Sequence, residues 1–211
     1  MSTNSSPLNE SVPVHVDELH SNRVETIEKR ENLPADIPKG SIVILHAIPS
    51  NIGTEHYRTD PADLRDPPTF GIARSPGEAA NSTIVDRGKV ETNVLPEMEV
   101  NPTAYSFISE KGWFEAVTTS FHSMGIIDSM LDDELIVTLQ GGLDCLERLA
   151  AQLPIYVYLT LVDVEGYRFE PAAMGYGYAP THLPKRCALG PSSVTDYVNR
   201  PDTISSLMSR F

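Results

Sequence analysis

The chain has few cysteines and no long apolar run. Its two cysteines, Cys145 and Cys187, lie in different segments, and two such thiols do not make the disulfide framework of a small secreted domain. No segment approaches the roughly 20 consecutive apolar residues that a membrane-spanning helix needs. The N-terminal stretch lacks the basic and apolar regions of a secretion signal. We therefore expect a cytoplasmic protein that does not enter a membrane.

Lysine is also scarce, whereas acidic residues are abundant. The chain carries 29 acidic against 16 basic residues, a net charge of -13, and only five of the basic residues are lysines. A dense carboxylate surface with little lysine is typical of halophilic proteins, which work in high salt; the alternative is an ordinary acidic cytosolic protein. Either way, this charge repels phosphate backbones, so we expect no direct duplex binding by the domain alone.

The signatures of the common enzyme classes are missing as well. The sequence contains no P-loop, no Gly-x-Gly-x-x-Gly after a strand, no Cys-x-x-Cys, no His-Glu-x-x-His and no Gly-x-Ser-x-Gly. The run Asp132-Asp133-Glu134 lies in the first turn of a predicted helix, where the helix dipole explains three acidic residues without a cation. We therefore predict neither a cofactor nor a metal.

The pattern of apolar residues predicts an α+β fold. We expect a disordered N-terminal tail over residues 1–16, a single domain over 17–170 and an irregular C-terminal extension over 171–211. The domain should contain a mostly antiparallel sheet of about five strands packed by one long helix. The expected helices are 17–31 and 130–153, and the expected strands are 41–48, 82–86, 105–110, 113–117, 155–162 and 167–169.

The helix predicted at 130–153 is the clearest of these elements. Its leucines recur every three or four residues and form one apolar stripe. Gly141 and Gly142 interrupt this helix, and each costs about 1 kcal/mol relative to alanine in a helix interior. The pair therefore indicates either a close crossing over the sheet or a kink.

Four blocks of the chain resemble a known family. They are residues 23–27 with Leu33-Pro34, the strand 44–49, the hairpin 105–117 and the strand 154–167. Together they resemble the C-terminal region of prokaryotic putative DNA-binding proteins that begin with a divergent AlbA-type (Schlafen-like) domain. The hairpin turn is Glu-Lys-Gly here, in place of the Arg-Asn-Gly typical of that region.

This resemblance implies an accessory domain without the activity of the AlbA-type domain. That domain occupies well over a hundred residues upstream in such proteins, whereas about twenty residues precede the first matching helix here. The resemblance implies a protein partner that supplies the DNA-binding function.

Two polar residues stand out within apolar strands. His46 lies in the strand before Pro49. It is either a core or sheet-face histidine hydrogen-bonded to a neighbour, or a ligand-contacting or acid/base group, a role that histidine can fill because the ordinary pKa of its side chain lies near neutrality. Glu115 shares a strand face with Trp113, so it is either solvated on an outward face or paired on an inward one. On an inward face, its expected partner is Arg168 or His46.

These observations favour a non-catalytic interaction or ligand-sensing domain, accessory to a DNA-binding partner. One alternative is an enzyme that uses His46 and Glu115 as an acid/base pair, which requires both side chains on one face within hydrogen-bond reach. Another is weak nucleic-acid association through a local arginine patch, which requires its members to cluster. The patch would contain Arg58, Arg65, Arg74 and Arg87, and the candidate interaction surface contains Trp113, Arg168, Tyr176 and Tyr178.

Overall fold

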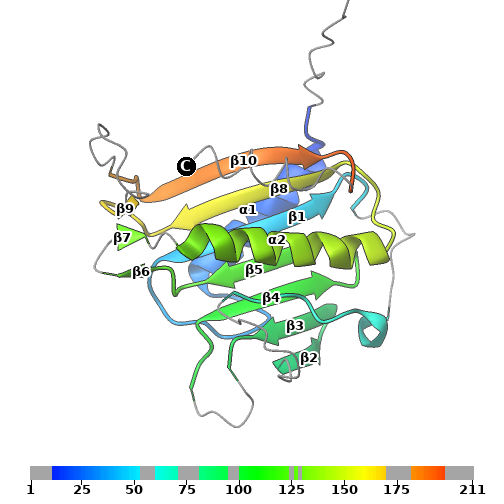
Figure 1. Cartoon of the computed structure of the whole chain (residues 1–211), viewed down its shortest axis with the longest axis horizontal. Coiled ribbons are helices and arrows are strands. Elements are labelled where there is room, and N and C mark those ends of the chain that lie inside the picture. Colours follow the sequence, from blue (N-terminus) through cyan, green and yellow to red (C-terminus); the bar gives the residue numbers. More distant parts are fainter. Residues whose placement is uncertain are drawn as a thin grey trace, which may run out of the picture.

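The computed structural model describes residues 11–52, 60–70, 81–94, 100–123, 126–127, 130–169 and 182–197 (Figure 1). Two α-helices, a short 3-10 helix and ten strands lie in this part of the chain. In chain order they are α1 (Val14–Lys29), β1 (Ile42–Pro49), η1 (Pro61–Asp63), β2 (Asn81–Val85), β3 (Gly88–Thr92), β4 (Ala104–Ser109), β5 (Phe114–Thr118), β6 (His122–Ser123), β7 (Ile126–Ile127), α2 (Met130–Arg148), β8 (Ile155–Val162), β9 (Arg168–Phe169) and β10 (Arg186–Val194).

A seven-stranded sheet forms the middle layer of the molecule. Its order is β10-β8-β1-β5-β4-β3-β2, and every neighbouring pair is antiparallel. Figure 1 shows α2 crossing one face of the sheet and α1 lying behind it. β6, β7 and β9 form a second, small sheet. The predicted α+β class and antiparallel pairing are confirmed, whereas the predicted number of strands, about five, was too low.

Four strands are missing from the prediction: β3, the short strands β6 and β7, and β10, which lies in the segment that we expected to be irregular. β10 pairs with β8 along the edge of the sheet, and only alternate residues near its end are buried. Pro191 lies where the register shifts between Leu189 and Ser192, a position in which a proline removes no ladder hydrogen bond. The domain therefore extends beyond residue 170 to include this strand. Residues 171–181 and 198–211 lie outside the described part.

β1 is covered on both of its faces. All eight of its residues are buried. Val43, Leu45 and Ala47 join the apolar cluster under α2, whereas Ile42 and Ile44 join the cluster under α1. A strand that is buried on both faces has a nearly continuous apolar sequence, as β1 and β8 do.

α1 begins three residues earlier than we predicted, at Val14, so the expected tail over 1–16 is wrong for its last three residues. Residues 1–10 lie outside the described part. Val16, Val24 and Ile27 are buried against the sheet. The helix ends where Arg30 takes a left-handed conformation with φ 57°.

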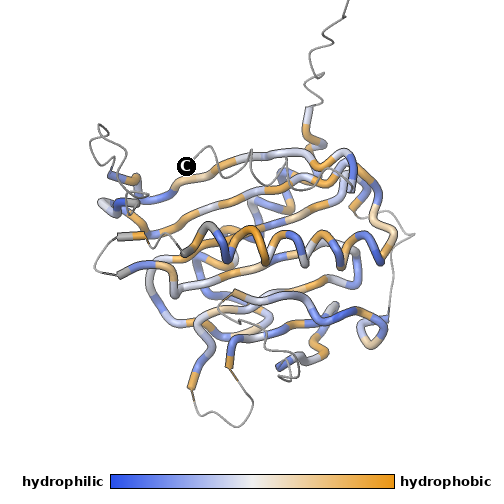
Figure 2. The backbone as a smooth tube through the Cα atoms, viewed as in Figure 1, coloured by the Kyte–Doolittle hydropathy of each residue, from blue (hydrophilic) through white to orange (hydrophobic). Residues whose placement is uncertain are grey.

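α2 lies across β1 and β5 with its leucine stripe inward, as predicted; the buried members are Leu131, Leu135, Leu139, Leu143 and Leu146. Figure 2 shows hydrophobic and hydrophilic residues alternating along this helix. A Cβ at Gly142 would lie 2.5 Å from the ring of Phe114, which confirms the close crossing. The helix stops at Arg148 instead of the predicted Leu153, because Ala150 adopts a φ of 54°. Neither helix of the described residues is long and apolar enough to cross a bilayer.

Candidate functional site

His46 and Glu115 lie side by side on the face of the sheet that α1 covers. They are direct partners in the antiparallel register of β1 and β5. Alternation along β5 places Glu115 on the same face as Val117, among the apolar residues under α1. Both side chains are 0% exposed. The hypothesis of a solvated, outward-facing Glu115 is therefore wrong.

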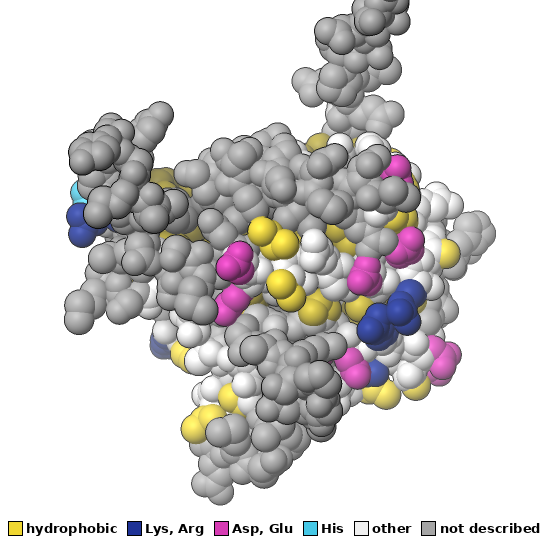
Figure 3. All heavy atoms as spheres, viewed as in Figure 1, with side chains coloured by type: hydrophobic (Ala, Val, Ile, Leu, Met, Phe, Trp, Pro, Cys, Tyr) yellow, Lys and Arg dark blue, Asp and Glu magenta, His cyan; other side chains and the backbone are white. Residues whose placement is uncertain are grey.

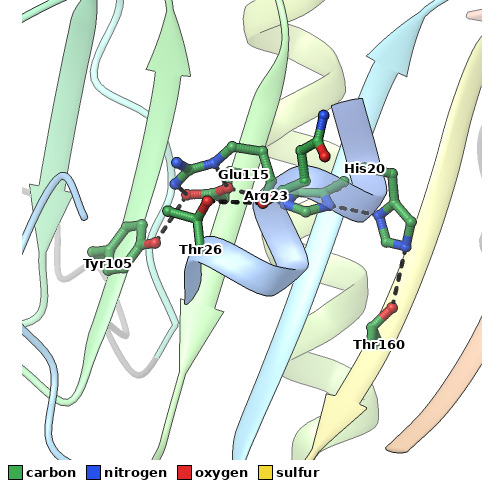
Figure 4. A network of polar contacts seen from close by, with 8 residues as sticks. His20, Arg23, Thr26, Tyr105, Glu115 and Thr160 are labelled. Atoms are coloured by element: carbon green, nitrogen blue, oxygen red, sulfur yellow. Dashed lines mark hydrogen bonds and ion pairs between the residues drawn. The ribbon is translucent and has the colours of Figure 1, made fainter. Parts of the chain in front are cut away.

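The Glu115 carboxylate accepts hydrogen bonds from three other elements (Figure 4). Arg23 of α1 donates from Nε to Oε2 at 2.9 Å and from Nη2 to Oε1 at 2.8 Å, which is the two-point pairing that a guanidinium makes with a carboxylate. The Tyr105 hydroxyl of β4 donates to Oε1 at 2.9 Å. His46 Nε2 lies 3.0 Å from Oε2. The buried charge is thus fully compensated.

These contacts keep Glu115 and Arg23 ionised. Burial by itself would raise the pKa of Glu115, but the charge of Arg23 and the hydrogen bonds from His46 and Arg23 lower it to about 2. Burial would lower the pKa of Arg23, and Glu115 overcomes this effect and raises it. Burial and the Glu115 charge raise the pKa of Tyr105 well above its ordinary value, so Tyr105 remains a neutral donor.

A second histidine extends the network towards β8. His20 Nδ1 of α1 lies 2.8 Å from His46 Nδ1, and its Nε2 lies 3.4 Å from the Thr160 hydroxyl. If His46 is neutral and donates to Glu115 through Nε2, its Nδ1 accepts the proton of His20 Nδ1, and Thr160 then donates to His20 Nε2. Each of these ring nitrogens then has a partner. His20 also stacks on the ring of Tyr158, with centroids 4.1 Å apart.

We expected Arg168 or His46 as the partner of Glu115. His46 is confirmed as a partner, whereas Arg168 lies exposed on β9, and the arginine that pairs with Glu115 is Arg23. Arg23 was missed because α1 is 92 residues away from Glu115 in sequence. The available signal was its place between Leu19 and Val24 in the apolar stripe of the predicted helix, where a charge needs a buried partner.

The other predicted residues do not gather at one place. Trp113 follows the turn before β5, near the end of β1, whereas Arg168 lies beyond β8, near the start of β1. Arg65 and Arg87 line two different pockets. Figure 3 shows a small group of basic side chains near η1 and the C-terminal end of α2, with acidic side chains around it. Tyr176, Tyr178, Arg58 and Arg74 lie outside the described residues.

A pocket of about 930 Å³ opens beside the network, between α1 with the segment that follows it on one side and β2, β4 and the turns after these two strands on the other. We call it the α1 pocket. Arg23 and Trp113 connect it to the network: the guanidinium lies 5.7 Å from the Trp113 ring, and the Arg23 side chain is 17% exposed. The residues that line the pocket are His15, Leu19, Arg23, Asn32, Leu33, Pro34, Ile52, Val85, Asp86, Arg87, Phe107, Ser109, Lys111 and Trp113.

The fully buried His46 and Glu115 do not line the α1 pocket. They meet the geometric condition of the acid/base hypothesis, because they share a face and lie 3.0 Å apart. In this conformation, however, Arg23 and Trp113 separate them from the pocket. Within the described ranges, no group of three or more His, Cys, Asp or Glu side chains has the geometry of a metal site.

Comparison with family models, curated proteins and solved structures found no match for this chain. The resemblance to the region that follows AlbA-type domains, and the DNA-binding partner that it implies, therefore stay predictions.

We predict that Glu115→Gln lowers the free energy of unfolding by about 3–5 kcal/mol. The substitution leaves the half-buried Arg23 without its counter-charge, and removing one partner of a buried ion pair typically costs this much. Urea unfolding measures the change. Glu165→Gln removes an exposed carboxylate and should change stability by less than about 0.5 kcal/mol. Equal effects of the two substitutions would contradict the role that we give to Glu115.

We also predict that the protein loses stability as the pH falls from about 6.5. Burial is the main cause that lowers the pKa of His20 to about 3, and the charge of Arg186 acts in the same direction. As the pH falls, His20 is therefore protonated in the unfolded chain before it is protonated in the folded protein. Its contribution is complete above pH 6.5 and is lost towards pH 3, with a slope of at most about 1.4 kcal/mol per pH unit. The lowered pKa of Glu115 adds a loss from about pH 4.5 towards pH 2.

Urea unfolding at a series of pH values measures this slope. His20→Asn should remove the part between pH 6.5 and 5, because the amide can still donate to His46 but does not titrate. His182→Asn, at an exposed position, should leave the slope unchanged. A slope that persists in His20→Asn would assign it to another group.

Proposed function

We propose that this chain is a non-catalytic ligand-binding domain that holds a small molecule in the α1 pocket. The observation that carries the proposal is the pocket itself, a concave space of about 930 Å³ with an apolar wall and a few polar groups. This volume is near the upper end of the range for pockets that bury drug-sized ligands. The apolar part of the wall includes Leu19, Leu33, Ile52, Phe107 and Trp113.

The arrangement around Glu115 supports binding without catalysis. An acid/base pair must reach its substrate, directly or through one water. His46 and Glu115 are fully buried, and both ring nitrogens of His46 and both carboxylate oxygens of Glu115 already have a hydrogen-bond partner in the protein. An enzyme that uses this pair stays the alternative, and it would require α1 to move away from the sheet.

The position of α1 also suits a sensor. Arg23 lines the α1 pocket and at the same time attaches α1 to β5 through Glu115. A ligand beside Arg23 would therefore add contacts to the helix that the buried network holds in place. Such contacts stabilise this position of α1 over any other, and a sensor needs such a difference in affinity between two states.

We predict that the native protein binds N-phenyl-1-naphthylamine, a neutral apolar fluorophore, at one site per chain. Trp113 is the only tryptophan, so energy transfer from tryptophan to the bound probe reports binding beside it. Leu33→Asn should weaken binding about tenfold, since it removes one half-buried apolar side chain from the wall.

The matched control is Val137→Asn, which makes the same kind of change at an exposed position of α2. It should leave the affinity unchanged. Absence of energy transfer, or equal weakening by the two substitutions, would contradict binding in the α1 pocket.

A further inference from the structure

The described lining of the α1 pocket has the opposite charge to the chain as a whole. It contains three permanent cations, Arg23, Arg87 and Lys111, and one carboxylate, Asp86. The whole chain carries 29 acidic against 16 basic residues. Charged residues taken at random from this chain would therefore carry a net negative charge. The cations come from three separate elements, namely α1, the β2–β3 turn and the β4–β5 turn, and the fold brings them to one hollow.

Two of the three cations have charge to offer to a ligand. Arg23 is committed to Glu115. Arg87 approaches only its neighbour Asp86, at 3.6 Å and with both side chains well exposed, and such a pair contributes little. Lys111 has no carboxylate partner among the described residues. An anion in the pocket would therefore find Arg87 and Lys111 without a strong competing carboxylate.

The rest of the wall requires that this anion have an apolar body. The Phe107 and Trp113 rings meet edge to face with centroids 5.4 Å apart, and aliphatic side chains of α1 and the following segment complete the wall. A phosphate or sulfate ion alone would leave these apolar side chains in contact with water. A polynucleotide would meet the repulsion of a chain with net charge -13, which a small ligand inside the hollow largely avoids.

We propose that the α1 pocket selects small organic anions. The anionic group lies between Lys111 and Arg87, and the apolar or aromatic body lies against Trp113 and Phe107. This inference rests on the proposed function, since it names the class of ligand for the same pocket.

The test compares two probes that differ in one anionic group. 8-Anilinonaphthalene-1-sulfonate carries a sulfonate on the ring system of the neutral N-phenyl-1-naphthylamine. Titration of the native protein at low salt, followed by energy transfer from Trp113, should give an affinity about tenfold higher for the sulfonate probe. The advantage should shrink as salt is added, because these cations are accessible to solvent.

The double variant Lys111→Gln/Arg87→Gln should remove this advantage, measured as the ratio of the affinities for the two probes. The control Lys185→Gln/Arg168→Gln makes the same change in net charge at exposed positions outside the pocket, and should keep the advantage. Both residues of the first variant are exposed, so both variants should retain the native near-UV circular dichroism.

The outcomes separate this inference from the proposed function. Equal affinity of the two probes, or an advantage that survives in Lys111→Gln/Arg87→Gln, overturns the selection for anions and leaves the ligand pocket standing. If the control variant loses the advantage of the sulfonate probe to the same extent, the advantage comes from the overall charge of the protein, and this result also overturns the inference. If neither probe binds beside Trp113, the proposed function itself fails.

Discussion

The buried carboxylate of Glu115 is the constraint on which the arrangement of this domain depends. An unpaired carboxylate at this depth would cost several kcal/mol, so its donors must be in place when the chain is folded. Arg23, His46 and Tyr105 come from α1, β1 and β4, and they meet Glu115 only if these elements take one relative position. Apolar packing alone tolerates small shifts of a helix along a sheet, whereas a two-point guanidinium–carboxylate pair does not. We infer that this ion pair sets the position of α1.

The sequence predicted the local part of this arrangement well and the distant part poorly. Period-two alternation placed Glu115 on the face of Trp113 and Val117, and the apolar strand around His46 made it a reasonable partner. Nothing local could show which arginine would complete the pair, because helix placement over a sheet depends on contacts between segments far apart in sequence. β10 was missed for a different reason: it is an edge strand that contains a proline and exposes half of its residues, so it lacks the apolar run of β1 and β8.

Arg23 connects the buried network around Glu115 to the α1 pocket, which is open to solvent. One side of its guanidinium holds Glu115, and the side chain also lines the α1 pocket beside Trp113. The groups with acid/base chemistry are therefore sequestered behind the pocket wall, and the groups that face the pocket are cations, aromatic rings and aliphatic side chains. This division favours recognition over reaction. It also means that a ligand next to Arg23 acts on the same residue that fixes α1.

The strength of an anion site on such an acidic chain depends on how close its contacts are. If the surface rich in acid and poor in lysine reflects work in high salt, then charges more than about 3 Å apart are screened at 1 M salt. Distant carboxylates then no longer repel a small anion, and distant cations no longer attract it. Direct contact with Lys111 and Arg87 would persist best where the apolar wall excludes water from one side of the ligand. The combination of cations with Trp113 and Phe107 therefore suits an anion site under these conditions, because apolar contact on one side of the ligand preserves the direct contact with the cations that salt would otherwise weaken.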